Sequence, residues 1–288
     1  MYAITGITGK VGGAMARALL AAGQPVRAVV RDARKGEAWA ALGCEVAFAG
    51  MEDPRALAEA FTGAAAVFIL PPSEFDPEPG YPEAKLVIDN VVAALTAART
   101  RRVLCLSTIG ADAVHDNLLS QRTMMEEALS KLGIPLTFLR PGWFIENALW
   151  DVASARDKGV IHSFLQPVDK AVPMVATQDV GRVAAALIQE NWSGTRIVEI
   201  EGPRRLSPDD LADAFGSALG RPVRPEPVMR DTWNDLFRSQ GMKNPEPRIR
   251  MLDGFNEGWI AFEDDGRKAL KGRIDADAVI AALVAQAS

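Results

Sequence analysis

Six short apolar runs alternate with five Ala- and Leu-rich segments over the first 140 residues, and this alternation restricts the fold most. Runs such as 66–70 and 102–107 are apolar on both faces, which is typical of buried parallel strands. The alternation predicts an α/β fold, a doubly wound parallel sheet of the Rossmann type. The expected strands are 2–5, 26–30, 44–49, 66–70, 102–107 and 136–140, and the expected helices are 12–22, 36–42, 54–61, 82–99 and 122–131.

The alternation stops after Pro141, and five of the six Trp lie beyond residue 142. Helices are expected there at 178–190, at 208–219, where Ser207-Pro208-Asp209-Asp210 is a start signal, and at 275–287, with a strand at 196–200. Residues 240–250, with two prolines, are expected to form a lid or an interface loop. We therefore expect two parts. The dinucleotide-binding domain is 1–142 plus about 178–201, and a smaller substrate-side cap is about 143–177 and 202–288.

A glycine-rich loop joins the first expected strand to the first expected helix, with the spacing Gly6-x-x-Gly9-x-x-Gly12. The first glycine permits a tight turn, the second permits close approach of a pyrophosphate, and the third permits close helix packing. The unpaired N–H groups at the helix start favour phosphate. The alternative is a purely structural turn. The loop residues assigned to cofactor binding are Gly6, Thr8, Gly9, Lys10 and Val11.

The second expected strand ends in Arg31, followed by Asp32, Arg34 and Lys35. A carboxylate at this place accepts from the ribose 2′-hydroxyl of NAD, whereas a guanidinium binds a 2′-phosphate. The sequence therefore favours NADP(H) over NAD(H). A solvated basic turn is the alternative, and Asp32 could partly neutralise the charge.

These motifs together resemble the NmrA-like family of atypical short-chain dehydrogenases, over roughly residues 1–230. The resemblance lies in 4–12, in Val30-Arg31-Asp32, in 139–147 (LRPGWFIEN) and in 175–180. The family includes quinone, azo-dye and triphenylmethane reductases and also redox-sensing regulators. It implies that the stretch containing Pro141, Gly142, Trp143 and Phe144 lies beside the nicotinamide.

Two departures from the family pattern concern the cofactor and the proton donor. The family often has Gly-Asp after the third strand, but this chain has Ala49-Gly50, so adenine contacts are expected from the backbone of Gly50 and Met51. The Tyr-x-x-x-Lys pair of typical short-chain dehydrogenases is missing, because Leu118 and Arg122 fall at its positions. Tyr81 and Lys85 have that spacing, but they precede a different helix, so we treat the match as accidental.

Several weaker candidates surround the expected cofactor site. Leu70 and Pro71 end the fourth strand and are expected to form the cofactor wall. Ser107 ends the fifth strand, where ligands of such sheets bind, and a hydroxyl that satisfies its own turn is the equal alternative. His115 and Arg122 are weak catalytic candidates, with a solvated loop histidine and a surface arginine as the alternatives. The expected substrate pocket is aromatic. Its residues are Trp143, Phe144, Trp150 and Trp233, with the core of the cap as the alternative.

Composition limits the partners. With 32 Lys and Arg against 37 Asp and Glu, the net charge of −5 gives no general attraction to nucleic acid or anionic membrane. The chain has only two Cys and two His, so we do not expect a metal site. We expect both cysteines to be reduced and the protein to be cytoplasmic. The sequence does not determine the number of subunits, and a homodimer is one assembly that it allows.

The sequence therefore supports an NADPH-dependent reductase for a flat aromatic acceptor, a quinone-like or azo compound. Hydride transfer to such an acceptor gives a stabilised anion, so the missing Tyr-x-x-x-Lys pair is less damaging than it is for a ketone substrate. The alternative is a non-catalytic NADP(H) sensor that binds a protein partner. A nucleotide-sugar epimerase or dehydratase is a third hypothesis, which the missing pair opposes.

Overall fold

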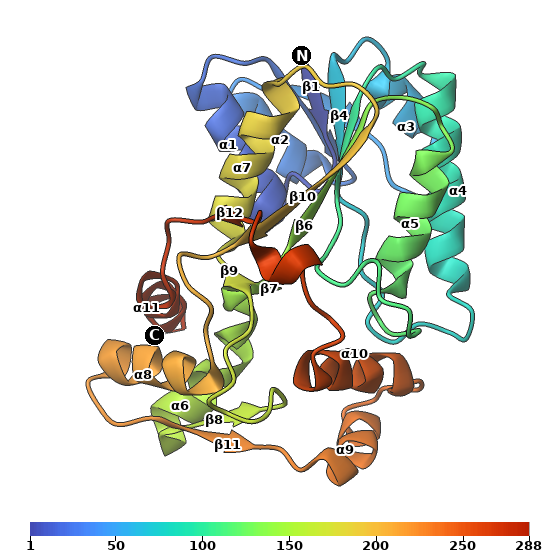
Figure 1. The fold of residues 1–288 in the computed structure, drawn as a ribbon. Coiled ribbons are helices and arrows are strands. Elements are labelled where there is room, and N and C mark those ends of the chain that lie inside the picture. Colours follow the sequence, from blue (N-terminus) through green and yellow to red (C-terminus); the bar gives the residue numbers. More distant parts are fainter. Residues whose placement is uncertain (288) are drawn as a thin grey trace.

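The framework of the protein, seen in a computed structural model that describes residues 1–287, is a sheet of eight parallel strands (Figure 1). Its order is β12-β10-β6-β5-β4-β1-β2-β3, so the chain starts in the middle and winds outward in both directions. The strands are β1 (Tyr2–Ile4), β2 (Val26–Val30), β3 (Glu45–Phe48), β4 (Ala66–Ile69), β5 (Val103–Leu106), β6 (Leu136–Pro141), β10 (Thr195–Glu201) and β12 (Leu270–Lys271). The doubly wound parallel sheet predicted from the sequence is confirmed.

Helices cover both faces of the sheet, and two apolar cores lie beneath them. One face carries α1 (Lys10–Ala21), α2 (Ala33–Ala41) and α7 (Thr177–Gln189), and the other carries α3 (Pro54–Phe61), α4 (Pro82–Ala97) and α5 (Ser120–Ser130). The strands β4 and β5 are fully buried, because helices pack against both their faces. This burial explains why their sequence is a continuous apolar run.

A smaller group of elements lies beyond the carboxyl ends of the strands, below the sheet in Figure 1. It has its own apolar cores, one of which contains Phe215 and Phe255. Its elements are β7 (Trp143–Phe144), η1 (Ile145–Asp151), α6 (Val152–Lys158), β8 (Val160–Ser163), β9 (Met174–Val175), α8 (Pro208–Leu219), β11 (Arg224–Pro227), η2 (Arg230–Thr232), α9 (Trp233–Ser239), α10 (Glu246–Glu257) and α11 (Ala276–Gln286). We refer to these elements as the cap.

The C-terminal segment returns to the sheet before its last helix. After η3 (Glu263–Gly266), β12 pairs with β10 in parallel. The carboxylate of Asp179, at the start of α7, accepts hydrogen bonds from the backbone N–H groups of Arg273 and Ile274, at 2.7 and 2.8 Å. Asp179 is 1% exposed, so a charge-assisted contact buried within the fold ties the segment to the sheet.

Two predicted elements need correction. The expected lid or loop at 240–250 is helical from Glu246 onward, because Pro247 occupies the first turn of α10, where a missing N–H costs nothing. The helix expected at 36–42 begins earlier, at Ala33, because the side chain of Asp32 caps it. Among residues 1–287, no helix combines the length and apolar character needed to cross a bilayer.

Candidate functional site

The glycine loop lies where β1 meets α1, and two of its glycines are sterically required. Gly6 has φ +62°, and a Cβ on Gly12 would lie 2.4 Å from the carbonyl oxygen of Gly6. Helix α1 begins after Gly9, and no side chain caps its N-terminus. Gly9 is exposed, and the N-terminal N–H groups there are free of side-chain partners. This arrangement provides a helix terminus at which a phosphate can accept several hydrogen bonds.

The tip of β2 carries three exposed basic residues, Arg31, Arg34 and Lys35. Within residues 1–287 none of them forms an ion pair. The only carboxylate between them, that of Asp32, accepts the backbone N–H of Lys35 at 3.0 Å as the N-cap of α2. The positive charge at this tip is therefore available to an anionic ligand.

The carboxyl ends of β3 and β4 lie beside those of β2 and β1, at the same edge of the sheet as the glycine loop. The carbonyl of Met51 accepts from Asn90 Nδ2 at 3.0 Å, which ties the loop after β3 to α4. The side chain of Glu52 lies over Gly50, where an added Cβ would be 2.1 Å from its Oε1. At β4, the N–H of Leu70 donates to Thr5 Oγ1 at 2.8 Å, which joins this end to the glycine loop.

Arg122 holds the loop that follows β4. Its guanidinium donates to the carbonyls of Pro71 and Pro72, at 3.0 and 3.1 Å, and to Ser73 Oγ at 2.6 Å. Among the residues described it has no carboxylate partner, and burial lowers its pKa. A cleft of about 90 Å³ between this loop, α4 and α5 is lined by Pro71 and Arg122. Arg122 is thus a half-buried cation held by the loop after β4 rather than a freely solvated one.

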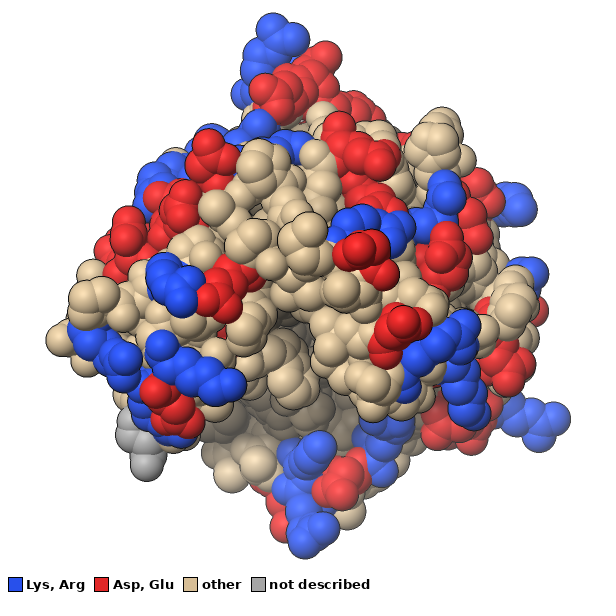
Figure 2. Space-filling view, turned by 90° about the horizontal axis from the view of Figure 1, so that it is seen from below, with Lys and Arg blue, Asp and Glu red and all other residues tan. Residues whose placement is uncertain are grey.

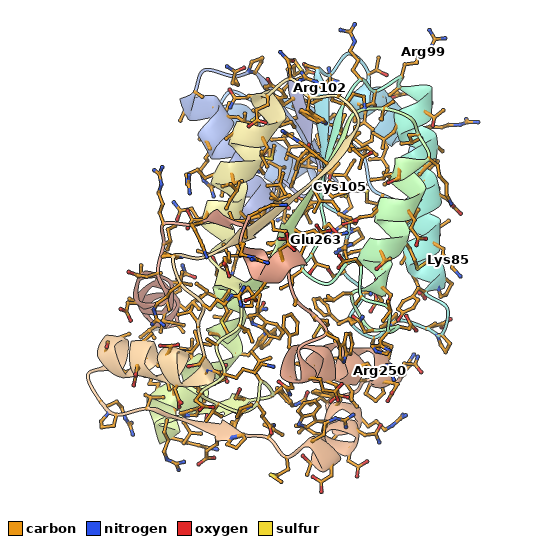
Figure 3. The ribbon with its side chains drawn as sticks, in the orientation of Figure 1. Lys85, Arg99, Arg102, Cys105, Arg250 and Glu263 are labelled. Atoms are coloured by element: carbon orange, nitrogen blue, oxygen red, sulfur yellow. The ribbon has the colours of Figure 1, made fainter. Side chains whose placement is uncertain are left out.

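Ser107 follows β5 and belongs to a buried polar network. Its hydroxyl donates to Glu126 on α5, and Glu126 forms a two-point ion pair with Arg140 from β6. Arg140 also donates to Asp112 at 2.9 Å, in the loop after β5. Cys105, labelled in Figure 3, lies fully buried in β5, and burial raises its pKa to about 12. The two cysteines are free thiols, Cys44 being the other.

The segment from Pro141 to Phe144 passes from the sheet into the cap. Gly142 is needed here, because a Cβ would lie 2.5 Å from the carbonyl oxygen of Pro173. The strand β7 pairs with β9, and the half-buried ring of Trp143 lies edge-on to Phe255, 5.2 Å between centroids. Of the expected pocket residues, the structure therefore brings Trp143 and Phe144, the two residues of β7, to the junction of sheet and cap.

Two of the expected pocket tryptophans lie elsewhere. Trp150 is 88% exposed on η1, and Trp233 is fully buried with its Nε1 donating to the carbonyl of Val228 at 2.8 Å. Trp233 packs with Phe164 and Phe237, so its ring belongs to the core of the cap and does not face an open pocket. The aromatic residues near Trp233 therefore fill the apolar core of the cap instead of lining a pocket.

The remaining acid–base candidates are dispersed. His115 is exposed, with its ring 5.0 Å from that of Trp259 in an edge-on contact. Tyr81 is buried, and its hydroxyl lies 2.9 Å from Asp116 Oδ1 and from the carbonyl of Asn117. Burial raises the pKa of Tyr81 well above its ordinary value. Lys85 is exposed on α4, on the outer side of the molecule in Figure 3.

Glu126 and Asp112 were not predicted to belong to the site region, and Arg140 and Glu146 were predicted there only as members of the 139–147 stretch. Glu146 accepts the backbone N–H of Thr177 at 2.9 Å and its hydroxyl, and so caps α7 from 31 residues away. The sequence position of Arg140 gave one indication of a buried ion pair. A charged residue at the end of an apolar strand run must find a partner when it is buried. The identity of that partner depends on which elements become neighbours.

Comparison with known proteins gives consistent results. The profile of the NmrA-like family matches residues 2–256. The NAD(P)H azoreductase of Xenophilus azovorans is 29% identical over 266 residues, which cover 89% of this chain and 85% of that one. Quinone oxidoreductase 2 of Escherichia coli is 27% identical over 244 residues, covering 84% and 82%.

Solved structures share the fold over nearly the whole chain. An NADPH-dependent quinone oxidoreductase of Escherichia coli, complexed with NADPH, superposes with a TM-score of 0.81 at 24% identity, covering 98% of this chain and 99% of that one. A Citrobacter triphenylmethane reductase gives 0.76 at 23% identity, covering 99% of both.

Proposed function

The chain belongs to the NmrA-like family, and from this membership we propose that it is a reductase that uses NADPH to reduce a flat conjugated acceptor. A quinone-like or azo compound is the acceptor class. The names of the azoreductase and quinone oxidoreductase relatives support this proposal. We propose that residues 1–142 and about 178–201 bind the dinucleotide and that the remainder covers the acceptor, apart from β12, which joins the sheet.

The observation that carries the cofactor assignment is the unpaired basic tip of β2. A 2′-phosphate brings about two negative charges, and Arg31 offers a guanidinium that fits phosphate geometry. Asp32 is adjacent and one of its oxygens, Oδ1, caps α2, so a single carboxylate faces the three cations Arg31, Arg34 and Lys35. Arg31 stands at the tip of β2, the place where an NAD site usually has a carboxylate that binds the ribose 2′-hydroxyl.

The residues along the sheet edge fit the rest of a dinucleotide. The uncapped start of α1 suits the pyrophosphate, and Glu52 offers a carboxylate to the adenine amino group beside Gly50. The cofactor-binding residues that we propose are Gly6, Thr8, Gly9, Lys10, Val11, Arg31, Gly50, Met51, Leu70, Pro71, Ser107, Pro141, Gly142, Trp143 and Phe144.

The acceptor class follows from what the chain places at the junction. When bound, NADPH supplies a hydride. The half-buried ring of Trp143, backed by the buried Phe255, offers aromatic surface. Figure 2 shows a hollow with uncharged residues in it and charged residues around it on the face seen from below. Hydride transfer to a quinone or an azo bond gives a stabilised anion that water can protonate. The chain then has only to bind the acceptor against the cofactor and exclude bulk water.

A second function, an NADP(H) sensor that binds a protein partner, shares the same cofactor site. The dispersed positions of His115 and Tyr81 favour it, because neither lies on β5 or α5, where a typical reductase keeps its proton donor. A sensor binds the cofactor without consuming it, so turnover separates the two functions.

The test follows the loss of NADPH absorbance with a panel of quinones and azo dyes. We expect acceptor-dependent oxidation, and we expect Arg31→Ala to raise the KM for NADPH about 10- to 100-fold with little effect on NADH. Arg224→Ala, an exposed arginine on β11, is the matched control. Cofactor binding without oxidation of NADPH by any acceptor would move the assignment to the sensor.

A further inference from the structure

Ser107 is the one member of the network of Ser107, Glu126, Arg140 and Asp112 that the proposed function uses, as a cofactor-binding residue, and the other three lie behind it. The side chains of Arg140 and Glu126 are 5% and 11% exposed. Arg140 Nε lies 3.0 Å from Glu126 Oε1, and Nη2 lies 2.7 Å from Oε2. The backbone N–H of Ser107 donates to the carbonyl of Leu139 at 2.8 Å. Ser107 is thus fixed by β6 and by α5 together.

The direction of the bond between Ser107 and Glu126 follows from this geometry. A guanidinium carries only donors, and its two-point contact with a buried carboxylate requires the ionised form. An ionised carboxylate carries only acceptors. The hydroxyl of Ser107 must therefore donate to Glu126 Oε1. A serine hydroxyl has one proton, so only the lone pairs of its oxygen remain for any other partner.

We infer that Ser107 acts toward the bound ligand as a hydrogen-bond acceptor and that Glu126 is the positioning residue that fixes this polarity. The inference rests on the proposed function and deepens it. The ligand group that meets Ser107 carries an N–H or O–H. Two groups in the proposed reaction have this chemistry: the carboxamide on the nicotinamide half of the cofactor and the hydroxyl of a reduced, quinol-like acceptor.

The same polarity excludes Ser107 as the source of the proton. In the proposed reaction the acceptor gains a hydride with its two electrons, the cofactor is oxidised, and one proton completes the reduced product. Ser107 cannot release its proton without a replacement from Glu126, and Glu126 has none while Arg140 holds both its oxygens. The proton comes from water. The half-exposed Asp112 forms the outer end of the network.

The experiment compares Ser107→Ala with Ser217→Ala, which removes the hydroxyl of an exposed serine on α8. Titrations measure the Kd of NADPH and of 2′-phospho-ADP-ribose, which lacks the nicotinamide. Kinetics measure kcat, its pH profile and product inhibition by a hydroquinone. We expect kcat in Ser107→Ala to stay within about 3-fold of the wild type with an unchanged pH profile, while one binding constant weakens about 3- to 15-fold.

The two ligand sources give different patterns. If the cofactor carboxamide binds Ser107, the Kd of NADPH rises and that of 2′-phospho-ADP-ribose does not. If the reduced acceptor binds it, only hydroquinone inhibition weakens. A kcat loss of about 100-fold or more with unchanged binding would show a proton donor and overturn the inference. Unchanged binding of all three ligands would overturn it as well.

Glu126→Gln tests the positioning role separately. Its amide N–H₂ can donate to Ser107, which then has one lone pair left and an O–H proton free to point at the ligand, so the fixed acceptor polarity is lost and we expect the same binding constant to weaken as in Ser107→Ala. Thermal unfolding identifies any loss of folded protein, because Arg140 loses an ionised partner. Retained wild-type affinity in folded Glu126→Gln would contradict the inference. The NADPH titrations apply even if no acceptor is reduced, so failure of the proposed function remains distinguishable.

Discussion

Asp76, in the loop after β4, accepts a hydrogen bond from the backbone N–H of Lys243 at 2.7 Å, although 167 residues separate the two. The other carboxylate oxygen accepts from the N–H of Asn244, also at 2.7 Å. These hydrogen bonds lower the pKa of Asp76. The contact joins the cofactor edge of the sheet to the start of α10, beside a second link in which the N–H of Leu118 donates to the carbonyl of Pro247.

Removing this carboxylate should loosen the cap without disturbing the cofactor site. For Asp76→Ala we expect the KM of the acceptor to rise about 3- to 10-fold and the Kd of NADPH to stay unchanged, since one or two charge-assisted hydrogen bonds are lost. Hydrogen exchange should also accelerate at the start of α10. Asp89→Ala, an exposed carboxylate on α4, is the control. A weakened NADPH affinity with an unchanged acceptor KM would contradict this prediction.

Asp151 makes stability fall as the pH rises. Burial raises its pKa to about 6, so the folded state binds the proton more tightly than the unfolded chain does. For an acid with a raised pKa, folding is favoured at low pH, and the stability is lost as pH rises from about 4 to about 6. Asp151→Asn keeps an oxygen for the backbone N–H of His162. It should stabilise the protein by about 1–3 kcal/mol at pH 8.

Urea unfolding at pH 8 and at pH 4 measures this effect. The gain from Asp151→Asn should shrink strongly at pH 4, where the native carboxyl is protonated. Asp157→Asn, an exposed neighbour on α6, is the control. An equal gain at both pH values would mean that the buried charge is not the cause.

The sheet could be predicted because its pattern is local. Buried parallel strands such as β4 and β5 are apolar on both faces, and the glycine loop needs only contiguous residues. The cap was harder to predict from the sequence. The burial of Trp233 and the start of α10 in a proline-rich stretch both depend on packing between elements. The network of Ser107, Glu126 and Arg140 could not be predicted from spacing, because it forms only where β5, β6 and α5 become neighbours.

Glu146 should contribute to stability rather than to chemistry. Its carboxylate satisfies the backbone N–H and the hydroxyl of Thr177 at the start of α7, where negative charge is also favoured by the helix dipole. Glu146→Ala should lower the free energy of unfolding by about 1–2 kcal/mol in urea unfolding. Glu127→Ala, exposed on α5, should change it by less than about 0.5 kcal/mol. An equal effect of the two variants would exclude this capping role.

Gly9 and Gly12 should respond differently to the same substitution. A Cβ on Gly9 would lie 3.3 Å from Gly6 O at an exposed position, whereas one on Gly12 would lie 2.4 Å from it in the interior. Gly9→Val should therefore weaken NADPH binding at least about 10-fold by blocking phosphate approach, with a nearly unchanged Tm. Gly12→Val should lower the Tm by several degrees as well, because overpacking costs about 1–3 kcal/mol. Fluorescence titration and thermal unfolding of both variants measure the contrast. Unchanged NADPH affinity in folded Gly9→Val would refute the assignment of this loop to the cofactor.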